Sequence, residues 1–241
     1  DPRKVPMKIF PGVHYFMGGV HVDWNHMTCI PGLFAAGECD YMYHGANRLG
    51  ANSLLSALYS GTVAGPAAAA YVSGLDHSAE ETRSSLFESY RKKEEEYDSF
   101  IRSMHGTENP YILHREMGEL MTKNVTVVRN NKDLAATDVE LQNFMERWSH
   151  INMIDNGFYS NQAVMFTKQL KNMMELARVI TIGALNRNES RGSHYKPEFP
   201  DRNDTDFLKT TKAFWTKEGP RFEWEDVDIS HIQPVARTYE K

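Results

Sequence analysis

Residues 44–55 read His-Gly-Ala-Asn-Arg-Leu-Gly-Ala-Asn-Ser-Leu-Leu, and this stretch decides how the first third of the chain is interpreted. Its glycines, Gly45 and Gly50, let the backbone approach a ligand closely. A helix is expected to begin near Asn52, and the unpaired N–H groups at its start carry a partial positive charge. The stretch is therefore typical either of a loop and a helix start that hold an anionic or electron-rich group or of an ordinary strand, turn and capped helix, which composition alone favours.

The residues before this stretch are rich in glycine and contain two candidate strands. Residues 30–37 form an apolar run that ends in a glycine turn, and residues 20–24 alternate in the manner of a half-buried strand. Glu38 follows the apolar run, where its carboxylate is placed to accept hydrogen bonds from ligand hydroxyls. These features predict part of an α/β layer with incomplete edges.

Residues 49–75 carry no formal charge, which raises the question of a membrane span. Their Gly, Ser, Thr, Ala and Pro content argues against one, because insertion into hydrocarbon relies on Leu, Ile, Phe and Val. Small side chains instead let a helix lie close against a sheet or a cofactor. We therefore expect a buried helix here, and only indirect contact with a membrane.

From residue 76 the chain becomes more charged, and its apolar residues follow helical spacing. Ser78 and Glu81 form a candidate capping box ahead of a charged helix, and Asn109-Pro110 is expected to open another. The helical stripes are Leu86, Tyr90, Tyr97 and Ile101, then Leu141, Phe144, Met145 and Trp148, then Phe166, Leu170, Met173, Ala177 and Ile180. They predict a small antiparallel bundle, in which such residues form a packing core more often than a cofactor site.

After Asn188 the chain is polar and punctuated by proline, with a short helix expected at residues 207–215 before an extended tail. Arg191 and His194 lie close to Glu189, and ion pairing that docks the tail is their leading interpretation, ahead of direct ligand contact. The predicted fold class is α+β. It has a partial α/β layer at residues 1–75, an antiparallel helical bundle at 76–188 and a carboxy-terminal docking segment at 189–241.

Composition and charge argue against several classes of protein. The net charge is −5 and the Lys and Arg residues are dispersed, which disfavours nucleic-acid binding. Cys29 and Cys39 are the two cysteines, a sparse usage that favours ordinary thiols in a reducing cytosol. His21 and His26 have no third ligand at zinc-like spacing, so no metal site is expected.

Five motifs, in combination and in order, resemble the flavoprotein subunits of succinate dehydrogenase and fumarate reductase. They are residues 44–55, Pro-Gly-Leu-Phe-Ala-Ala-Gly-Glu at 31–38, His-Tyr-Phe-Met-Gly-Gly at 14–19, Glu-Ser-Arg-Gly-Ser-His at 189–194 and Phe-Pro-Asp-Arg-Asn-Asp at 199–204. The resemblance is to the carboxy-terminal portion of that family and covers nearly the whole chain. It implies that residues 1–75 end an FAD-binding domain and include the return from a capping domain.

The resemblance also implies roles for individual residues. Glu38, Ser53 and Leu54 would contact FAD, and His14 and Arg48 would bind the carboxylates of the substrate. A guanidinium offers paired planar donors that match a carboxylate, so Arg48 is suited to clamp one end of a C4 dicarboxylate. His14 is singled out by the resemblance alone, because a lone histidine is more often structural. His44 and Asn47 are interpreted as shaping the loop.

The implied activity is oxidation of succinate to fumarate through FAD, with electrons passed to an iron–sulfur subunit and quinone. The implied location is the cytoplasmic face of the cell membrane, through partner subunits that include a membrane anchor. Fumarate reductase is an alternative because it uses the same site, and L-aspartate oxidase shares the His-Gly-Ala-Asn-Arg pattern. An alternative of another class is a noncatalytic helical interaction module.

Two parts of the family pattern are not found in this sequence. They are the Gly-x-Gly-x-x-Gly turn for the FAD pyrophosphate and the arginine that transfers a proton, both of which precede these motifs in the family. The chain opens at Asp1-Pro2 without an initiator Met, so we expect a piece of a longer polypeptide. No catalytic residue is therefore assigned within this chain, and the chain alone is expected to retain FAD weakly and to be inactive.

Overall fold

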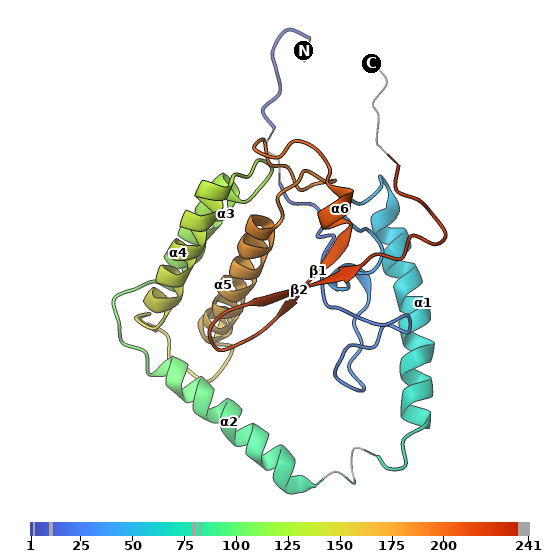
Figure 1. Ribbon diagram of the computed structural model, residues 1–241. Helices are drawn as coiled ribbons and strands as arrows, with labels where there is room; N and C mark the ends of the chain where they lie inside the picture. Colours follow the sequence, from blue (N-terminus) through green and yellow to red (C-terminus); the bar gives the residue numbers. More distant parts are fainter. Residues whose placement is uncertain (2, 10–11, 79–80, 82, 236–241) are drawn as a thin grey trace. The chain divides into compact units, whose positions relative to one another are not determined.

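The computed structural model describes residues 1, 3–9, 12–78, 81 and 83–235 (Figure 1). The chain divides into two compact units, Asp1–Ser78 and Ala79–Lys241. The mixed class of helices with a small sheet is confirmed. The predicted domain boundaries after residues 75 and 188 stay predictions.

The first unit consists of loops, a 3-10 turn η1 (Gly37–Cys39) and one long helix, α1 (Asn52–Ser73). The helix begins at the predicted residue. The predicted strands at 20–24 and 30–37 are wrong, because the described part of this unit has only isolated bridges, one at residue 20 and one at residue 27. Residues 30–33 form a turn in which the Leu33 N–H donates to the Ile30 carbonyl, three residues earlier. After this turn the run pairs with the preceding segment only through the single bridge between Met27 and Phe34.

Helix α1 buries a face of small residues, as expected for a helix packed closely against backbone. Ser56, Ser60 and Ala64 are buried, and the Ser60 hydroxyl accepts a hydrogen bond from the Gly37 N–H at 2.7 Å. The opposite face is apolar and exposed, with Leu58 at 70% exposure. The expectation of a buried helix therefore holds for one face. By length and hydropathy, no helix among the described residues qualifies to cross a bilayer.

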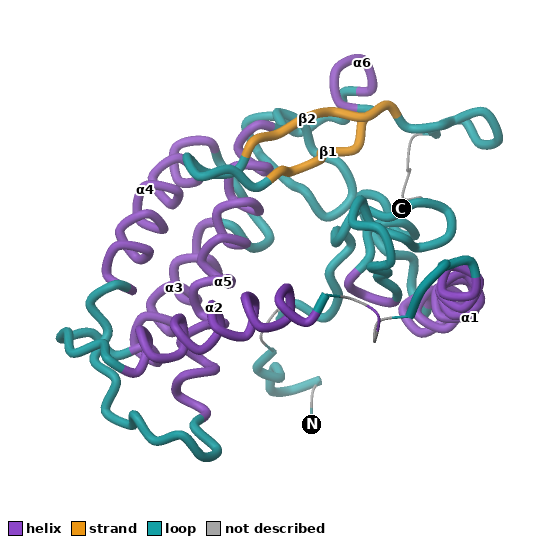
Figure 2. The backbone as a smooth tube through the Cα atoms, turned by 90° about the horizontal axis from the view of Figure 1, so that it is seen from below, coloured by secondary structure: helices purple, strands orange, loops and turns teal. Residues whose placement is uncertain are grey.

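The second unit contains the predicted helical bundle, formed by α2 (Ser84–Arg102), α3 (Pro110–Asn124), α4 (Asn131–Trp148) and α5 (Gln162–Asn186). Figure 2 shows α3, α4 and α5 lying side by side. Their core includes the fully buried side chains of Ile101, Leu113, Leu141, Leu170 and Met174. Three of these residues belong to the stripes that predicted the bundle, so the helical periodicity is confirmed.

The helix starts in this unit show which capping signals were correct. Asn109 accepts a hydrogen bond from the Tyr111 N–H at 2.9 Å, and Pro110 is the first helical residue, as predicted. The capping box at Ser78 and Glu81 is wrong, because α2 begins later and its N-cap residue, Arg83, makes no capping hydrogen bond. Residues 79 and 80 of that box lie outside the described residues.

The carboxy-terminal part holds α6 (Asp204–Phe207) and an antiparallel hairpin of β1 (Lys209–Phe214) and β2 (Arg221–Asp226) (Figure 1). The predicted helix at residues 207–215 is therefore wrong. Thr210 and Thr211 are β-branched and favour a strand. A turn closed by Gly219, whose φ of 126° suits glycine, returns the chain so that β1 gains its partner.

Candidate functional site

Residues 14–16 form the point in the first unit at which several predicted site residues converge. The Phe16 N–H donates to a carboxylate oxygen of Glu38 at 3.0 Å. The Arg48 guanidinium carbon lies 5.2 Å from the centroid of the Tyr15 ring. His14 precedes these two residues and is exposed. The structure therefore places Glu38 and Arg48 against immediate neighbours of His14.

A glycine allows the segment around His14 to lie against the turn that carries Glu38. The Val20 N–H donates to the Cys39 carbonyl at 2.7 Å. A Cβ atom added to Gly19 would lie 2.3 Å from the same carbonyl oxygen, closer than any side-chain carbon can approach. Only glycine fits there, so Gly19 of the motif has a packing role beside the site.

Arg48 is half-buried and has unused hydrogen-bond donors. One guanidinium nitrogen donates to the Leu49 carbonyl at 3.4 Å, which is long for a hydrogen bond. Among the described residues, no carboxylate forms an ion pair with Arg48. A guanidinium has five N–H groups, so most of its in-plane edge stays available for an anion.

The start of α1 is left without a cap. Its N-cap residue Ala51 is in the left-handed conformation, with φ of 64°, and makes no side-chain capping bond. The first N–H groups of a helix have no intrahelical acceptor, and Ser53 and Leu54 belong to this first turn. The Leu54 side chain is 75% exposed. An uncapped helix start is suited to an anionic or electron-rich group, and the binding role of Ser53 and Leu54 stays a prediction.

His44 belongs to a hydrogen-bonded chain that fixes its tautomer. The Ser56 hydroxyl donates to the Ser53 carbonyl at 3.0 Å, so it accepts at 2.9 Å from His44 Nε2, which carries the hydrogen. Burial lowers the pKa of His44, and the nearby positive charge of Arg48 lowers it further, against a smaller opposing effect of Asp40. His44 is therefore neutral near pH 7.

Tyr15 and Ser56 are the residues of this site that sequence reasoning missed. The Tyr15 hydroxyl lies 3.5 Å from the Ser56 hydroxyl, and its ring meets the His44 ring edge-on at 5.0 Å. The sequence contains only weak signals for these two residues. Tyr15 follows His14 inside a quoted motif, and Ser56 stands three residues after Ser53, one turn along the helix.

His26 has ordinary structural partners. His26 is fully buried, with Nε2 2.6 Å from the Tyr43 hydroxyl and Nδ1 3.1 Å from the Ala35 carbonyl. Burial raises the pKa of Tyr43, and Asp40 raises it further. Within the described residues, no group of three His, Cys, Asp or Glu side chains is arranged to hold a metal ion.

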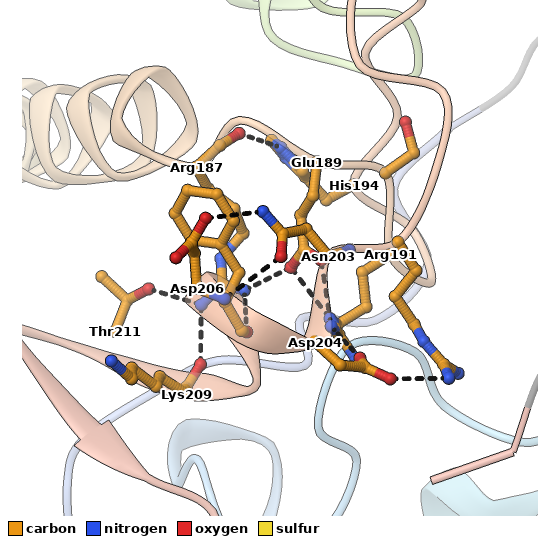
Figure 3. Close-up of polar contacts among 12 residues, drawn as sticks. Arg187, Glu189, Arg191, His194, Asn203, Asp204, Asp206, Lys209 and Thr211 are labelled. Carbon is orange, nitrogen blue, oxygen red and sulfur yellow. Dashed lines mark hydrogen bonds and ion pairs between the residues drawn. The ribbon is translucent and has the colours of Figure 1, made fainter.

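The late motif forms a separate polar cluster in the second unit, centred on Glu189 (Figure 3). This fully buried carboxylate accepts hydrogen bonds from Arg187 at 2.6 Å, from Arg191 at 2.8 and 3.0 Å, and from the Asn203 N–H at 2.9 Å. The predicted ion pairing of Arg191 with Glu189 is confirmed. Docking of this segment on the first unit stays a prediction.

His194 completes this cluster as a neutral histidine. Its Nδ1 accepts from Arg129 at 2.7 Å, and its Nε2 donates to the Arg187 carbonyl at 2.9 Å. Burial lowers the pKa of His194 to about 4, and the positive charges of Arg129 and Lys196 add to the effect. These contacts are internal, which favours a structural role over ligand binding.

Two family models match the sequence. One, described as fumarate reductase flavoprotein C-term, matches residues 114–239, and one described as FAD binding domain matches residues 1–54. The succinate dehydrogenase flavoprotein subunit of Bacillus subtilis is 62% identical, over 100% of this chain and 42% of that protein. The fumarate reductase flavoprotein subunit of Haemophilus influenzae is 34% identical, over 99% of this chain and 40% of that protein.

Comparison with solved structures gives matches of the same kind. The fold superposes on a variant of Escherichia coli quinol fumarate reductase FrdA with a TM-score of 0.91 and 32% identity, covering 99% of this chain and 41% of that one. Mycobacterium smegmatis Sdh1 in complex with UQ1 gives a TM-score of 0.75 and 27% identity, with 89% and 36% covered. The chain thus spans about two fifths of the length of the curated relatives named above.

Proposed function

Because the chain belongs to the succinate dehydrogenase and fumarate reductase flavoprotein family, we propose that it is the carboxy-terminal portion of a succinate dehydrogenase flavoprotein subunit. Within that subunit it contributes to an FAD-dependent site that oxidises succinate to fumarate. The observation that carries this proposal is that Arg48 lies over the ring of Tyr15, next to His14 in the chain, and has no carboxylate partner among the described residues.

Arg48 and His14 bind the substrate in this proposal. A C4 dicarboxylate carries an anion at each end, and Arg48 offers a planar pair of donors to one of them. His14 is exposed and makes no hydrogen bond among the described residues, so its ring is free to donate to the other end. Two such contacts fix the carbon–carbon bond that is oxidised.

Glu38, Ser53 and Leu54 are proposed to hold FAD, and the geometry of the described residues fits that group. The uncapped start of α1 offers N–H groups and partial positive charge to an electron-rich ring edge. One carboxylate oxygen of Glu38 accepts from Phe16, which leaves the other oxygen for a hydroxyl of the cofactor. When bound, FAD supplies the hydride acceptor. The proton-transferring arginine is proposed to lie in the amino-terminal part of the same polypeptide.

The partners and location of the whole subunit are also proposals. They are an iron–sulfur subunit, a membrane anchor reached through it, and a peripheral position on the cytoplasmic face of the cell membrane. Solved relatives include a quinol–fumarate reductase with menaquinol molecules, which supports transfer of electrons between flavin and quinone. Identity of 62% to a succinate dehydrogenase, against 34% to a fumarate reductase, supports assignment to the succinate dehydrogenase type.

The test compares the intact flavoprotein with its Arg48→Ala variant. We expect the variant to retain FAD absorbance and to lose succinate turnover by roughly 100-fold or more, because a charge-assisted clamp on the substrate is removed. Near-normal turnover would exclude Arg48 from the site. Faster turnover of aspartate than of succinate would favour an L-aspartate oxidase, and absence of flavin from the intact protein would favour a noncatalytic module.

A further inference from the structure

We propose that Tyr15 is a positioning residue whose ring holds the Arg48 guanidinium beside it, so that the N–H donors of Arg48 are presented to a dicarboxylate. This inference rests on the proposed function. Tyr15 is not one of the residues assigned to substrate or cofactor by the sequence motifs. Its role is inferred from contacts that join three parts of the first unit.

The hydrogen-bond donors of the Arg48 guanidinium all lie in one plane. The guanidinium has five N–H groups in this plane, whereas its two faces carry none. The Tyr15 ring covers Arg48 at 5.2 Å from the guanidinium carbon to the ring centroid, which is within the range of cation–π attraction. The carbons of the ring accept no conventional hydrogen bond, so this contact restrains Arg48 without satisfying its N–H groups.

Apart from the Tyr15 ring, few contacts restrain the Arg48 side chain. The 3.4 Å contact with the Leu49 carbonyl is long, and no described carboxylate pairs with the side chain. An arginine without such contacts samples many rotamers and must be ordered each time that a ligand binds. The aromatic contact therefore provides most of the preorganisation of Arg48 in the described structure.

Tyr15 is itself held by contacts with His44 and Ser56. Its ring packs edge-on against His44 at 5.0 Å, and its hydroxyl lies 3.5 Å from Ser56. His44 donates to the same Ser56 hydroxyl, which in turn donates to the Ser53 carbonyl in the first turn of α1. The ring is thus placed by the loop that carries Arg48 and by the helix start proposed to hold FAD.

Two substitutions separate the ring from the hydroxyl. Tyr15→Phe keeps the aromatic face and removes an oxygen whose 3.5 Å contact is weak, whereas Tyr15→Leu removes the face. We expect the dissociation constant of malonate, a dicarboxylate that succinate chemistry cannot oxidise, to rise about 10-fold in Tyr15→Leu and less than about 2-fold in Tyr15→Phe. The measurement is the change in flavin absorbance on titration of the intact flavoprotein.

A double-mutant cycle distinguishes positioning of Arg48 from general damage. In the Arg48→Ala background, Tyr15→Leu has no arginine to position, so malonate affinity should change by less than about 2-fold. If Tyr15→Leu weakens malonate binding equally in the wild-type and Arg48→Ala backgrounds, the inference is overturned. Wild-type malonate affinity in Tyr15→Leu would overturn it as well. A Tyr15→Phe variant as weak as Tyr15→Leu would assign the effect to the hydroxyl and overturn it as well.

Two further outcomes are distinguishable. If Tyr15→Leu does not retain FAD, the malonate titration and the double-mutant cycle are repeated with Tyr15→Met. Methionine is an unbranched apolar side chain and has no aromatic ring. If malonate fails to perturb the flavin of the wild-type protein, the proposed function itself fails. If malonate binding depends on Arg48 but not on the Tyr15 ring, the proposed function stands and this inference alone fails.

Discussion

Arg187 and Arg48 are both among the arginines that lie over aromatic rings, and their remaining contacts distinguish a structural role from a binding role. Arg187 lies 4.9 Å from the Trp224 ring centroid, and its N–H groups are used by Glu189, by two backbone carbonyls and by Thr211. Arg48 has a similar aromatic contact but only one long hydrogen bond. The unused donors of Arg48 are the reason to expect a ligand there.

Sequence patterns predicted Glu38 and Arg48 as site residues but did not point to Tyr15, the residue over which Arg48 lies. Glu38 and Arg48 lie in glycine-rich motifs whose chemistry can be interpreted residue by residue. The role of Tyr15 depends on contacts with residues 29 to 41 positions away, such as the one to Ser56. Such contacts follow from the fold and leave no local signal in composition or spacing.

The buried His194 predicts a loss of stability in acid. Its pKa is about 4 in the folded chain and near 6.5 when unfolded, so the unfolded state binds the extra proton between these values. The contribution of His194 to the unfolding free energy is complete above pH 6.5 and is lost as the pH falls toward 4. Arg129, Lys196 and Arg187, which surround the ring, disfavour its protonation.

Urea unfolding of the chain at pH 7 and pH 4.5 measures this effect. We expect His194 to account for roughly 2 kcal/mol of the difference in unfolding free energy between the two pH values. The matched control is His194→Gln, which keeps an amide donor and acceptor and cannot titrate in this range. Equal pH dependence in wild type and variant would contradict the burial of a neutral ring.

At the scale of elements, helices were predicted better than strands, because a helix satisfies its own backbone whereas a strand needs a neighbour. The stripes in α4 and α5 and the Asn109-Pro110 start were visible locally. Residues 30–37 have strand-like composition, but residues 30–33 form a turn. Residues 209–214 form a strand because residues 221–226, which follow a glycine turn, pair with them.

The loop between α2 and α3 depends on one glycine. The Gly106 N–H donates to the Ile151 carbonyl at 3.0 Å, and a Cβ atom on Gly106 would overlap the backbone carbonyl of His150. We expect Gly106→Ala to lower the unfolding free energy by about 3 kcal/mol, because backbone must move to admit the methyl group. The measurement is urea unfolding followed by circular dichroism at 222 nm.

Gly118, in the middle of α3, is the matched control for this substitution. Nothing lies within 4 Å of a Cβ atom added there. Gly118→Ala should therefore raise the unfolding free energy by about 0.5 to 1 kcal/mol through helix propensity alone. Similar effects of the two substitutions would show that the loop does not pack against residue 150 as described.

At the scale of the whole molecule, the chain spans about two fifths of its curated relatives, and the first unit shows a correspondingly open helix face. Leu54, Leu55 and Leu58 on α1 are 64–75% exposed. Apolar side chains of this size are usually covered in a complete domain. We therefore expect the remainder of the flavoprotein to complete the FAD site.

This expectation predicts that the 241-residue chain alone retains little FAD. The described residues offer a helix start and one carboxylate, and the glycine turn that binds pyrophosphate in this family is not found in the sequence. Purification in the presence of FAD, followed by desalting and absorbance at 450 nm, checks it. A stoichiometric yellow preparation that oxidises succinate would contradict the prediction.

The central claim is that Arg48 binds a dicarboxylate beside FAD in the intact flavoprotein, and flavin reduction in a single turnover tests it most directly. Oxidised wild-type flavoprotein and its Arg48→Ala variant, each with bound FAD, are mixed anaerobically with succinate while absorbance at 450 nm is followed. We predict rapid bleaching of the wild-type flavin and roughly 100-fold slower bleaching in the variant. Bleaching of both proteins at the same rate would contradict the claim.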